Sequence, residues 1–80
     1  MESVAEILSN FKKNNEWISE NYEKLKKQYN NQWVAVLTCT VVDHDPDLKN
    51  LVKRLRVNHS KVYNHIAVEY VTSEELDLIL

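Results

Sequence analysis

The residues best suited to chemistry lie in the stretch 43–47, which holds three aspartates and a histidine. Aspartates at alternate positions resemble the start of a calcium-binding loop, which supplies oxygen ligands at that spacing. Such a loop also needs glycine at its sixth position and glutamate at its twelfth, where this chain has Leu48 and Arg54. A zinc site would need further nitrogen or sulfur ligands, and no other histidine or cysteine is spaced to supply them. The sequence therefore predicts no metal site and no cofactor.

The start of a helix explains the same stretch without a ligand. Asp45 followed by Pro46 is the pattern of an N-cap followed by proline at the first helical position. Asp47 would then lie in the first turn, where the positive end of the helix dipole stabilises its charge. Asp43 and His44 would end the preceding strand. We therefore predict a helix cap at Asp45.

Catalysis has little support in the sequence. Cys39 would need a histidine beside it to act as a nucleophile, and its apolar neighbours are typical of a small core residue. The chain contains no glycine, which excludes the glycine-rich loops that bind nucleotide phosphates. The sequence predicts that the protein is not an enzyme.

Residues 49–61 are basic and contain no acid; the cations are Lys49, Lys53, Arg54, Arg56 and Lys61. A basic helix face followed by a turn can contact the phosphates of nucleic acid. The alternative is a solvated helix face whose cations are stabilised near the helix C-terminus. The net charge of the chain is −2, so it has no general attraction to nucleic acid. Nucleic-acid binding through these residues is therefore the second hypothesis of function.

The elements that position these residues begin with a long apolar pattern. From residue 4 to residue 29 apolar side chains recur at helical spacing and follow a heptad in which Asn15 occupies the seam. This pattern predicts one long helix, or two helices hinged at residues 13–16, where Asn14 and Asn15 lower helix propensity. A heptad with a polar seam residue can also specify a coiled coil. The alternative is that the second half of the helix packs on the domain's own sheet.

Residues 32–42 are rich in β-branched and aromatic side chains, which predicts a hairpin bending near Thr38 and Cys39, or else one bent strand. Apolar side chains on both faces of the first half indicate a central strand. A helix over 46–57 and a half-exposed strand over 65–71 follow. We expect a three-stranded sheet with the second strand, the first and the third in that order.

Since glycine is absent, asparagines at 30–31 and 58 are expected to take left-handed turn positions. Thr72 and Glu75 match a capping box that would open a short helix over 72–80. The predicted fold class is α+β with two layers: a long helix, a hairpin, a helix, a third strand and a short C-terminal helix.

Composition indicates a small ordinary domain. Eighty residues, 44% hydrophobic and 28% charged, form a single domain with a modest core. A lone cysteine excludes an internal disulfide and favours a reducing compartment. The N-terminal residues are acidic where a signal peptide is basic, and no long apolar run follows. We therefore expect a cytoplasmic protein that makes no contact with a membrane.

The segments "NEWISENYEKLKKQYNNQWVAVLTCTVV" and "IAVEYV" together resemble a family of small prokaryotic proteins, archaeal and bacterial, of unknown function. The resemblance covers residues 16–71, and the matching positions are Trp17, Tyr22, Leu25, Tyr29, 33–36, 41–42 and 68–71. Relatives place Asp-Gly or Asn-Gly at the hairpin turn and glycine before the helix, where this chain has Thr38, Cys39 and His44. The resemblance supports the fold and implies no activity. It separates a core, 16–71, from an N-terminal helical extension, 1–15, and a tail, 72–80.

Apolar residues remain on both sides of this core: Val4, Ile7, Leu8 and Phe11 before it, and Leu76, Leu78, Ile79 and Leu80 after it. Exposed together they would form a patch of the kind that marks interaction sites. A small core also leaves little margin of stability. The sequence predicts a non-enzymatic module for protein–protein association, as a homo-oligomer, a companion subunit or both.

Overall fold

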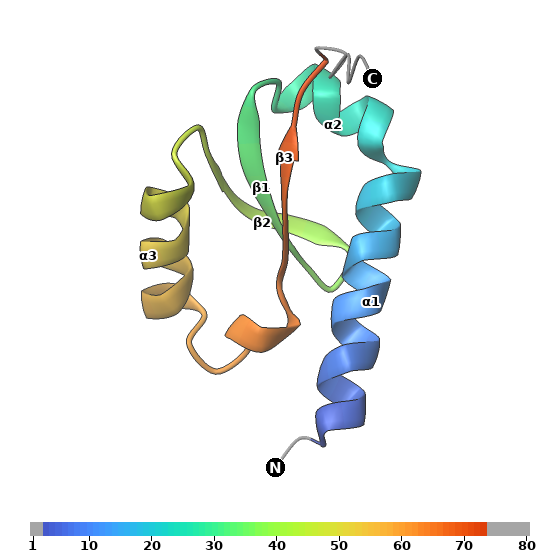
Figure 1. Cartoon of the computed structure of the whole chain (residues 1–80), viewed down its shortest axis with the longest axis vertical. Helices are drawn as coiled ribbons and strands as arrows, with labels where there is room; N and C mark the ends of the chain where they lie inside the picture. Colours follow the sequence, from blue (N-terminus) through green and yellow to red (C-terminus); the bar gives the residue numbers. More distant parts are fainter. Residues whose placement is uncertain (1–2, 74–80) are drawn as a thin grey trace, which may run out of the picture.

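The computed structural model describes residues 3–73 (Figure 1). Its elements are α1 (Val4–Glu20), α2 (Tyr22–Gln28), β1 (Gln32–Leu37), β2 (Thr40–Asp45), α3 (Leu48–Asn58), the 3-10 helix η1 (Tyr63–His65) and β3 (Ala67–Val71). The strands form an antiparallel sheet of order β2-β1-β3. The predicted α+β class and strand order are confirmed. The short helix predicted over 72–80 lies almost entirely outside the described residues.

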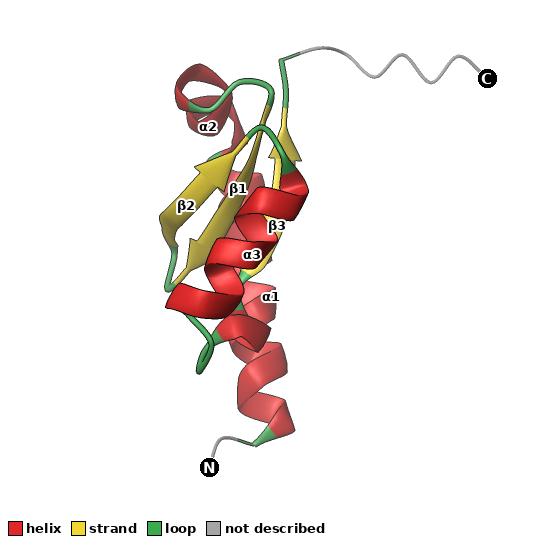
Figure 2. Cartoon of the chain, turned by 90° about the vertical axis from the view of Figure 1, so that its left-hand side faces the viewer, coloured by secondary structure: helices red, strands yellow, loops and turns green. Residues whose placement is uncertain are grey.

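The sheet has a hydrophobic core on each face, because successive side chains of β1 point to opposite sides. One core contains Ile18, Leu25, Val34, Val36, Ala67 and Val71. The other contains Ala35, Leu51, Leu55 and Ile66. Figure 2 shows α3 on the opposite side of the sheet from α1. Two layers were expected, but helices cover both faces, which explains why the first half of β1 is apolar on both sides.

The helical N-terminal segment breaks at Asn21, between α1 and α2. The Asn21 side-chain amide donates to the Trp17 carbonyl oxygen at 2.9 Å, and such a bond to the preceding turn competes with regular helix geometry. The hinge predicted at residues 13–16 is wrong, since this stretch is continuous helix. Asn14, rather than the predicted seam residue Asn15, faces the interior, and it is 2% exposed.

The predicted hairpin is confirmed, with a two-residue turn at Thr38 and Cys39. Both residues have positive φ, 53° and 55°, as a type I′ turn requires. This conformation is unfavourable for residues other than glycine, and most of all for β-branched threonine. The turn carries Cys39 out to the surface, so the expectation of a core cysteine is wrong.

Asparagine replaces glycine at one of the two predicted positions. Asn31 has a φ of 61°, whereas Asn58 is the last residue of α3, so the expectation at 58 is wrong. The third strand was predicted to begin at residue 65, but it begins at Ala67, since His65 still belongs to the 3-10 helix. No helix within residues 3–73 is long and apolar enough to cross a membrane.

Candidate functional site

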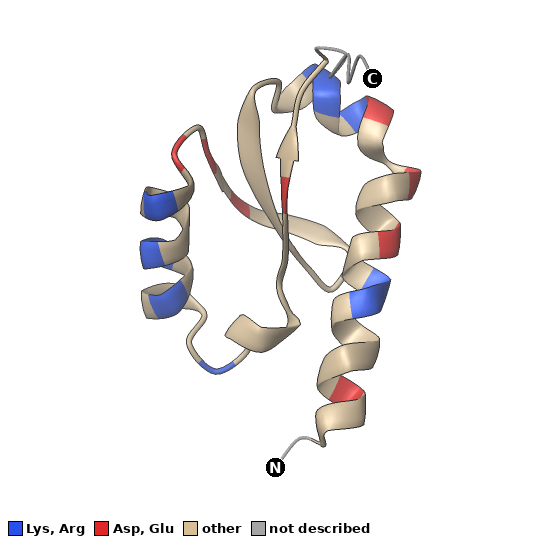
Figure 3. Cartoon of the chain, viewed as in Figure 1, with Lys and Arg blue, Asp and Glu red and all other residues tan. Residues whose placement is uncertain are grey.

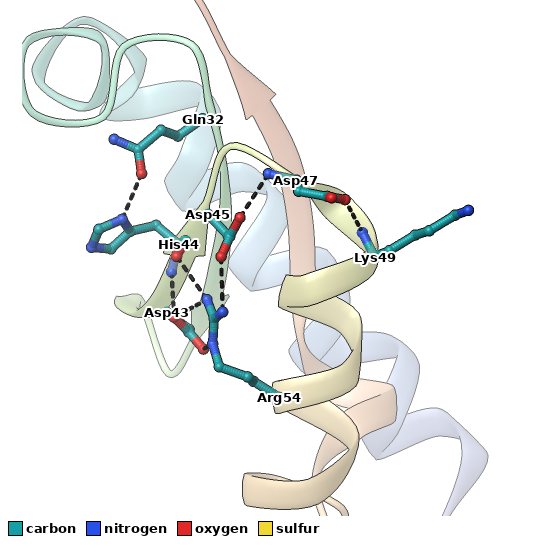
Figure 4. A network of polar contacts seen from close by, with 7 residues as sticks. All are labelled: Gln32, Asp43, His44, Asp45, Asp47, Lys49 and Arg54. Atoms are coloured by element: carbon teal, nitrogen blue, oxygen red, sulfur yellow. Dashed lines mark hydrogen bonds and ion pairs between the residues drawn. The ribbon is translucent and has the colours of Figure 1, made fainter.

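The acidic stretch holds an arginine of its own chain (Figure 4). Arg54 Nε donates to Asp43 Oδ2 at 2.9 Å, and Arg54 Nη2 donates to Asp43 Oδ1 at 3.0 Å. Arg54 Nη1 donates to Asp45 Oδ2 at 2.8 Å, and Nη2 also reaches the His44 carbonyl oxygen at 2.9 Å. One guanidinium group therefore ties the end of β2 to the middle of α3.

These hydrogen bonds keep both carboxylates charged. The bonds from Arg54 lower the pKa of Asp43, and the backbone N–H of His44 lowers it further, while partial burial opposes them. The pKa of Asp45 is lowered by Arg54 first and then by the backbone N–H of Asp47. The pKa of Arg54 is raised in turn, chiefly by Asp43 and then by Asp45. The cluster is thus an internal ion pair, and within residues 3–73 no three His, Cys, Asp or Glu side chains are grouped to hold a metal ion.

The helix cap predicted at Asp45 is wrong by two residues. The N-cap of α3 is Asp47, whose carboxylate accepts from the backbone N–H of Lys49 at 2.9 Å. Asp45 instead accepts from the N–H of Asp47 at 2.7 Å and so forms the turn that precedes the helix. Asp45 is the last residue of β2, and its carboxylate is bound to Arg54 of α3 and to the N–H of Asp47. Pro46 lies before the N-cap Asp47 rather than in the first turn of the helix.

The basic residues predicted to contact nucleic acid divide into two groups. Arg54 is held by the aspartates, whereas Lys49, Lys53 and Arg56 are exposed on α3. Figure 3 shows the basic side of α3 facing away from the sheet. The fifth, Lys61, is exposed in the following loop. Among residues 3–73 the ion pairs within 4.0 Å do not include these lysines.

The predicted N-terminal interface residues lie on the part of α1 that extends past the sheet (Figure 1). Val4 is 71%, Leu8 60% and Phe11 41% exposed, and Ile7 is partly buried. We call Val4, Leu8 and Phe11 the α1 stripe; they repeat at i, i+4 and i+7, the spacing of one helix face. The C-terminal set, Leu76, Leu78, Ile79 and Leu80, lies outside the described residues.

A groove joins the α1 stripe to the sheet. It has a volume of about 230 Å³ and is lined by Phe11, Tyr63, Asn64, Ile66 and Val68. Phe11 is the last residue of the stripe, and Val68 belongs to β3. This groove was not predicted from the sequence, because it is built from α1 and from a segment more than fifty residues later.

A larger cleft of about 400 Å³ lies between α1, the hairpin turn and η1. At its wall, Asn14 Nδ2 donates to the His65 carbonyl oxygen at 2.7 Å, and Asn14 Oδ1 accepts from the backbone N–H of Cys39 at 3.0 Å. Asn10 Nδ2 lies 3.0 Å from His65 Nδ1. These polar groups bind one another, so they hold three elements together.

One family matches most of the chain: a family of unknown function (DUF5678) matches residues 24–74. The matched region begins after α1 and includes the sheet and α3. A search of curated proteins and a search of solved structures found no match. The predicted resemblance to a family of unknown function is therefore confirmed, although the matched region begins at residue 24 and the predicted one began at residue 16.

Proposed function

The chain belongs to the DUF5678 family of unknown function, and we propose that it is a non-enzymatic module for protein–protein association. The surface that associates comprises the α1 stripe and the groove beside Phe11. The α1 stripe lies before the matched region 24–74, whereas the groove residues Tyr63, Asn64, Ile66 and Val68 lie within it.

The exposed α1 stripe is the observation that carries this proposal. Val4 and Leu8 are more than half exposed on the part of α1 that extends past the sheet, so packing in the domain's own core does not require them to be apolar. Removing apolar surface from water yields about 25 cal/mol per Å². A partner that covered these side chains together with the groove would gain this free energy. Exposed apolar surface of this contiguous kind is typical of interaction sites.

The cytoplasm is the proposed location, because the single cysteine is exposed and has no second cysteine in the chain to pair with. A prokaryotic source is also part of the proposal and rests on the resemblance of residues 16–71. The proposal of a non-enzymatic role is supported by the polar groups of the large cleft, which are engaged in holding the fold.

The test compares two variants in which serine replaces exposed apolar side chains on different helices. Leu8→Ser with Phe11→Ser removes the centre of the stripe, whereas Val57→Ser removes an apolar side chain that is 79% exposed on α3. Light scattering of the pure protein gives its oligomeric state, and affinity capture from the native cell identifies its partners. We expect assembly or a captured partner to be lost in the stripe variant and kept in the Val57 variant. A monomer that captures the same proteins in all three forms would refute the proposal.

Nucleic-acid binding is the second candidate, and the basic side of α3 favours it. Lys49, Lys53 and Arg56 repeat at i, i+4 and i+7 on a helix that contains no acid, so their charges add along one face. Contacts to phosphates release counterions and make binding steeply dependent on salt. A gel shift at low salt that is unchanged by Lys53→Glu and Arg56→Glu would remove this candidate.

A further inference from the structure

The two edges of the sheet differ in how they are protected. Unpaired edge strands can add strands from other chains, and proteins usually block them with charges, bulges or covering segments. The β2 edge carries the Arg54 ion pair with Asp43 and Asp45, and its pairing with β1 is irregular opposite Ala35 and Val36. Among the described residues the β3 edge has neither an ion pair nor a bulge, and the charged side chain of β3 is the exposed Glu69. Within residues 3–73, β1 is the only strand that pairs with β3.

The backbone of β3 presents hydrogen-bonding groups to the outside. The Val71 carbonyl oxygen accepts from the Asn31 N–H at 2.8 Å, which turns Val71 toward β1. Because backbone groups alternate along a strand, those of Val68 and Tyr70 point away from β1. At the end of the strand the Tyr22 hydroxyl of α2 donates to the Tyr70 carbonyl oxygen at 3.5 Å and accepts from the Thr72 N–H at 3.3 Å. The outward groups that remain for a partner are therefore the N–H and carbonyl of Val68 and the N–H of Tyr70. Figure 1 looks onto this edge, and none of the helices described within residues 3–73 crosses in front of it.

The groove beside Phe11 lies at the beginning of the same edge. Ile66 and Val68, which line it, are the residue before β3 and the second residue of β3. A strand added to β3 would therefore run past the groove, and one of its apolar side chains could enter. Main-chain pairing together with a pocket for an alternate side chain is the mode by which proteins recognise extended peptides.

We propose that β3 is the docking site for an extended segment of a partner protein, which adds a fourth strand and places an apolar side chain in the Phe11 groove. This inference rests on the proposed function and names the kind of partner. The partner segment would place apolar residues opposite Val68 and Tyr70, on the side of the sheet where Tyr70 packs 5.2 Å from Trp33 between ring centroids. Between them, opposite exposed Glu69, it would place lysine or arginine.

Glu69 also argues against a second copy as the occupant. Two β3 strands paired antiparallel with full overlap would match Val68 with Tyr70 and place each Glu69 directly opposite the other. Like charges opposite one another destabilise a strand pair. A segment with a basic residue at that position has no such penalty.

The test uses a library of displayed random peptides about eight residues long, enough to span β3 at about 3.3 Å per residue. The full chain is the bait, and an enriched peptide is then titrated into the labelled protein by NMR. Tyr70→Pro removes the outward N–H without touching the bonds to β1. Tyr70→Thr removes the same ring but keeps the N–H, and so serves as the matched control. Circular dichroism verifies that both variants are folded.

We expect enriched peptides to alternate apolar residues around a basic one and to shift the amide signals of Val68 and Tyr70. Tyr70→Pro should weaken binding about tenfold more than Tyr70→Thr, the loss of roughly one backbone hydrogen bond, and Glu69→Lys should reverse the preferred charge. The absence of enriched peptides, or equal binding by the proline and threonine variants, would overturn the inference. So would a dimer that Tyr70→Pro dissociates, since the occupant would then be a second copy. If the partners captured through Leu8 and Phe11 ignore Tyr70→Pro, the proposed function stands and the strand mode alone fails.

Discussion

Replacing Asn14 by alanine should lower the free energy of unfolding far more than replacing the neighbouring Asn15. The Asn14 amide donates to the His65 carbonyl oxygen and accepts from the Cys39 N–H. A buried group that loses its partner costs about 1–3 kcal/mol. Two such groups cost about 2–6 kcal/mol, and alanine regains about 0.5 kcal/mol through helix propensity, so the expected loss is about 1.5–5.5 kcal/mol. A chain of eighty residues has a free energy of unfolding of about 4–12 kcal/mol.

The neighbouring residue supplies the control. Asn15 Nδ2 donates to the Phe11 carbonyl oxygen at 3.2 Å in an exposed setting, so Asn15→Ala gains the same helix propensity and loses no buried bond. Unfolding in urea can be followed by the fluorescence of Trp17 and Trp33, and the midpoint and slope give the free energy. We expect the free energy of unfolding of Asn15→Ala to equal or slightly exceed that of the wild type.

A difference of less than about 0.5 kcal/mol between the two alanine variants would refute the reasoning, since it is the size expected of an ordinary surface change. Asn14→Asp separates the two bonds. Its carboxylate still accepts from the Cys39 N–H but cannot donate to the His65 carbonyl oxygen. It should therefore be destabilised at neutral pH, and stability close to that of the wild type would show that the bond to His65 contributes little.

Two further predictions concern the hairpin and the ion pair. Thr38→Asn with Cys39→Gly, residues that favour positive φ, should raise the free energy of unfolding by about 1–2 kcal/mol in the same urea assay; a lower value would mean that the turn is not strained. Arg54 lowers the pKa of Asp43 and Asp45 in the folded state. The ion pair therefore contributes its full stabilisation of the folded state above the ordinary aspartate pKa of about 3.9. This contribution is lost as pH falls through the lowered pKa values. Arg54→Gln should therefore lose less stability than the wild type between about pH 4 and pH 2 in acid unfolding followed by circular dichroism, and identical pH profiles would contradict this.

The sequence predicted the elements whose signal is local. The apolar spacing of α3, the β-branched run of β1 and the turn at Thr38 and Cys39 depend on residues within a few positions of one another. The strand order followed from the two-sided apolarity of β1, which marks a central strand. The same two-sided pattern was explained incompletely, because apolar residues on both faces also indicate helices on both faces.

Only the tertiary structure decided which polar groups meet. The sequence predicted Arg54 as part of a basic face and Asp45 as a helix cap. In the structure, the packing of α3 beside β2 places Arg54 Nη1 2.8 Å from Asp45 Oδ2. Asn14 and Asn15 are alike in sequence, but only Asn14 lies on the side of α1 that packs against the hairpin turn and η1. An apolar pattern repeats at a regular spacing and can therefore be recognised in the sequence. A hydrogen bond needs two atoms about 3 Å apart, and for residues far apart in sequence, only the packing of whole elements sets that distance.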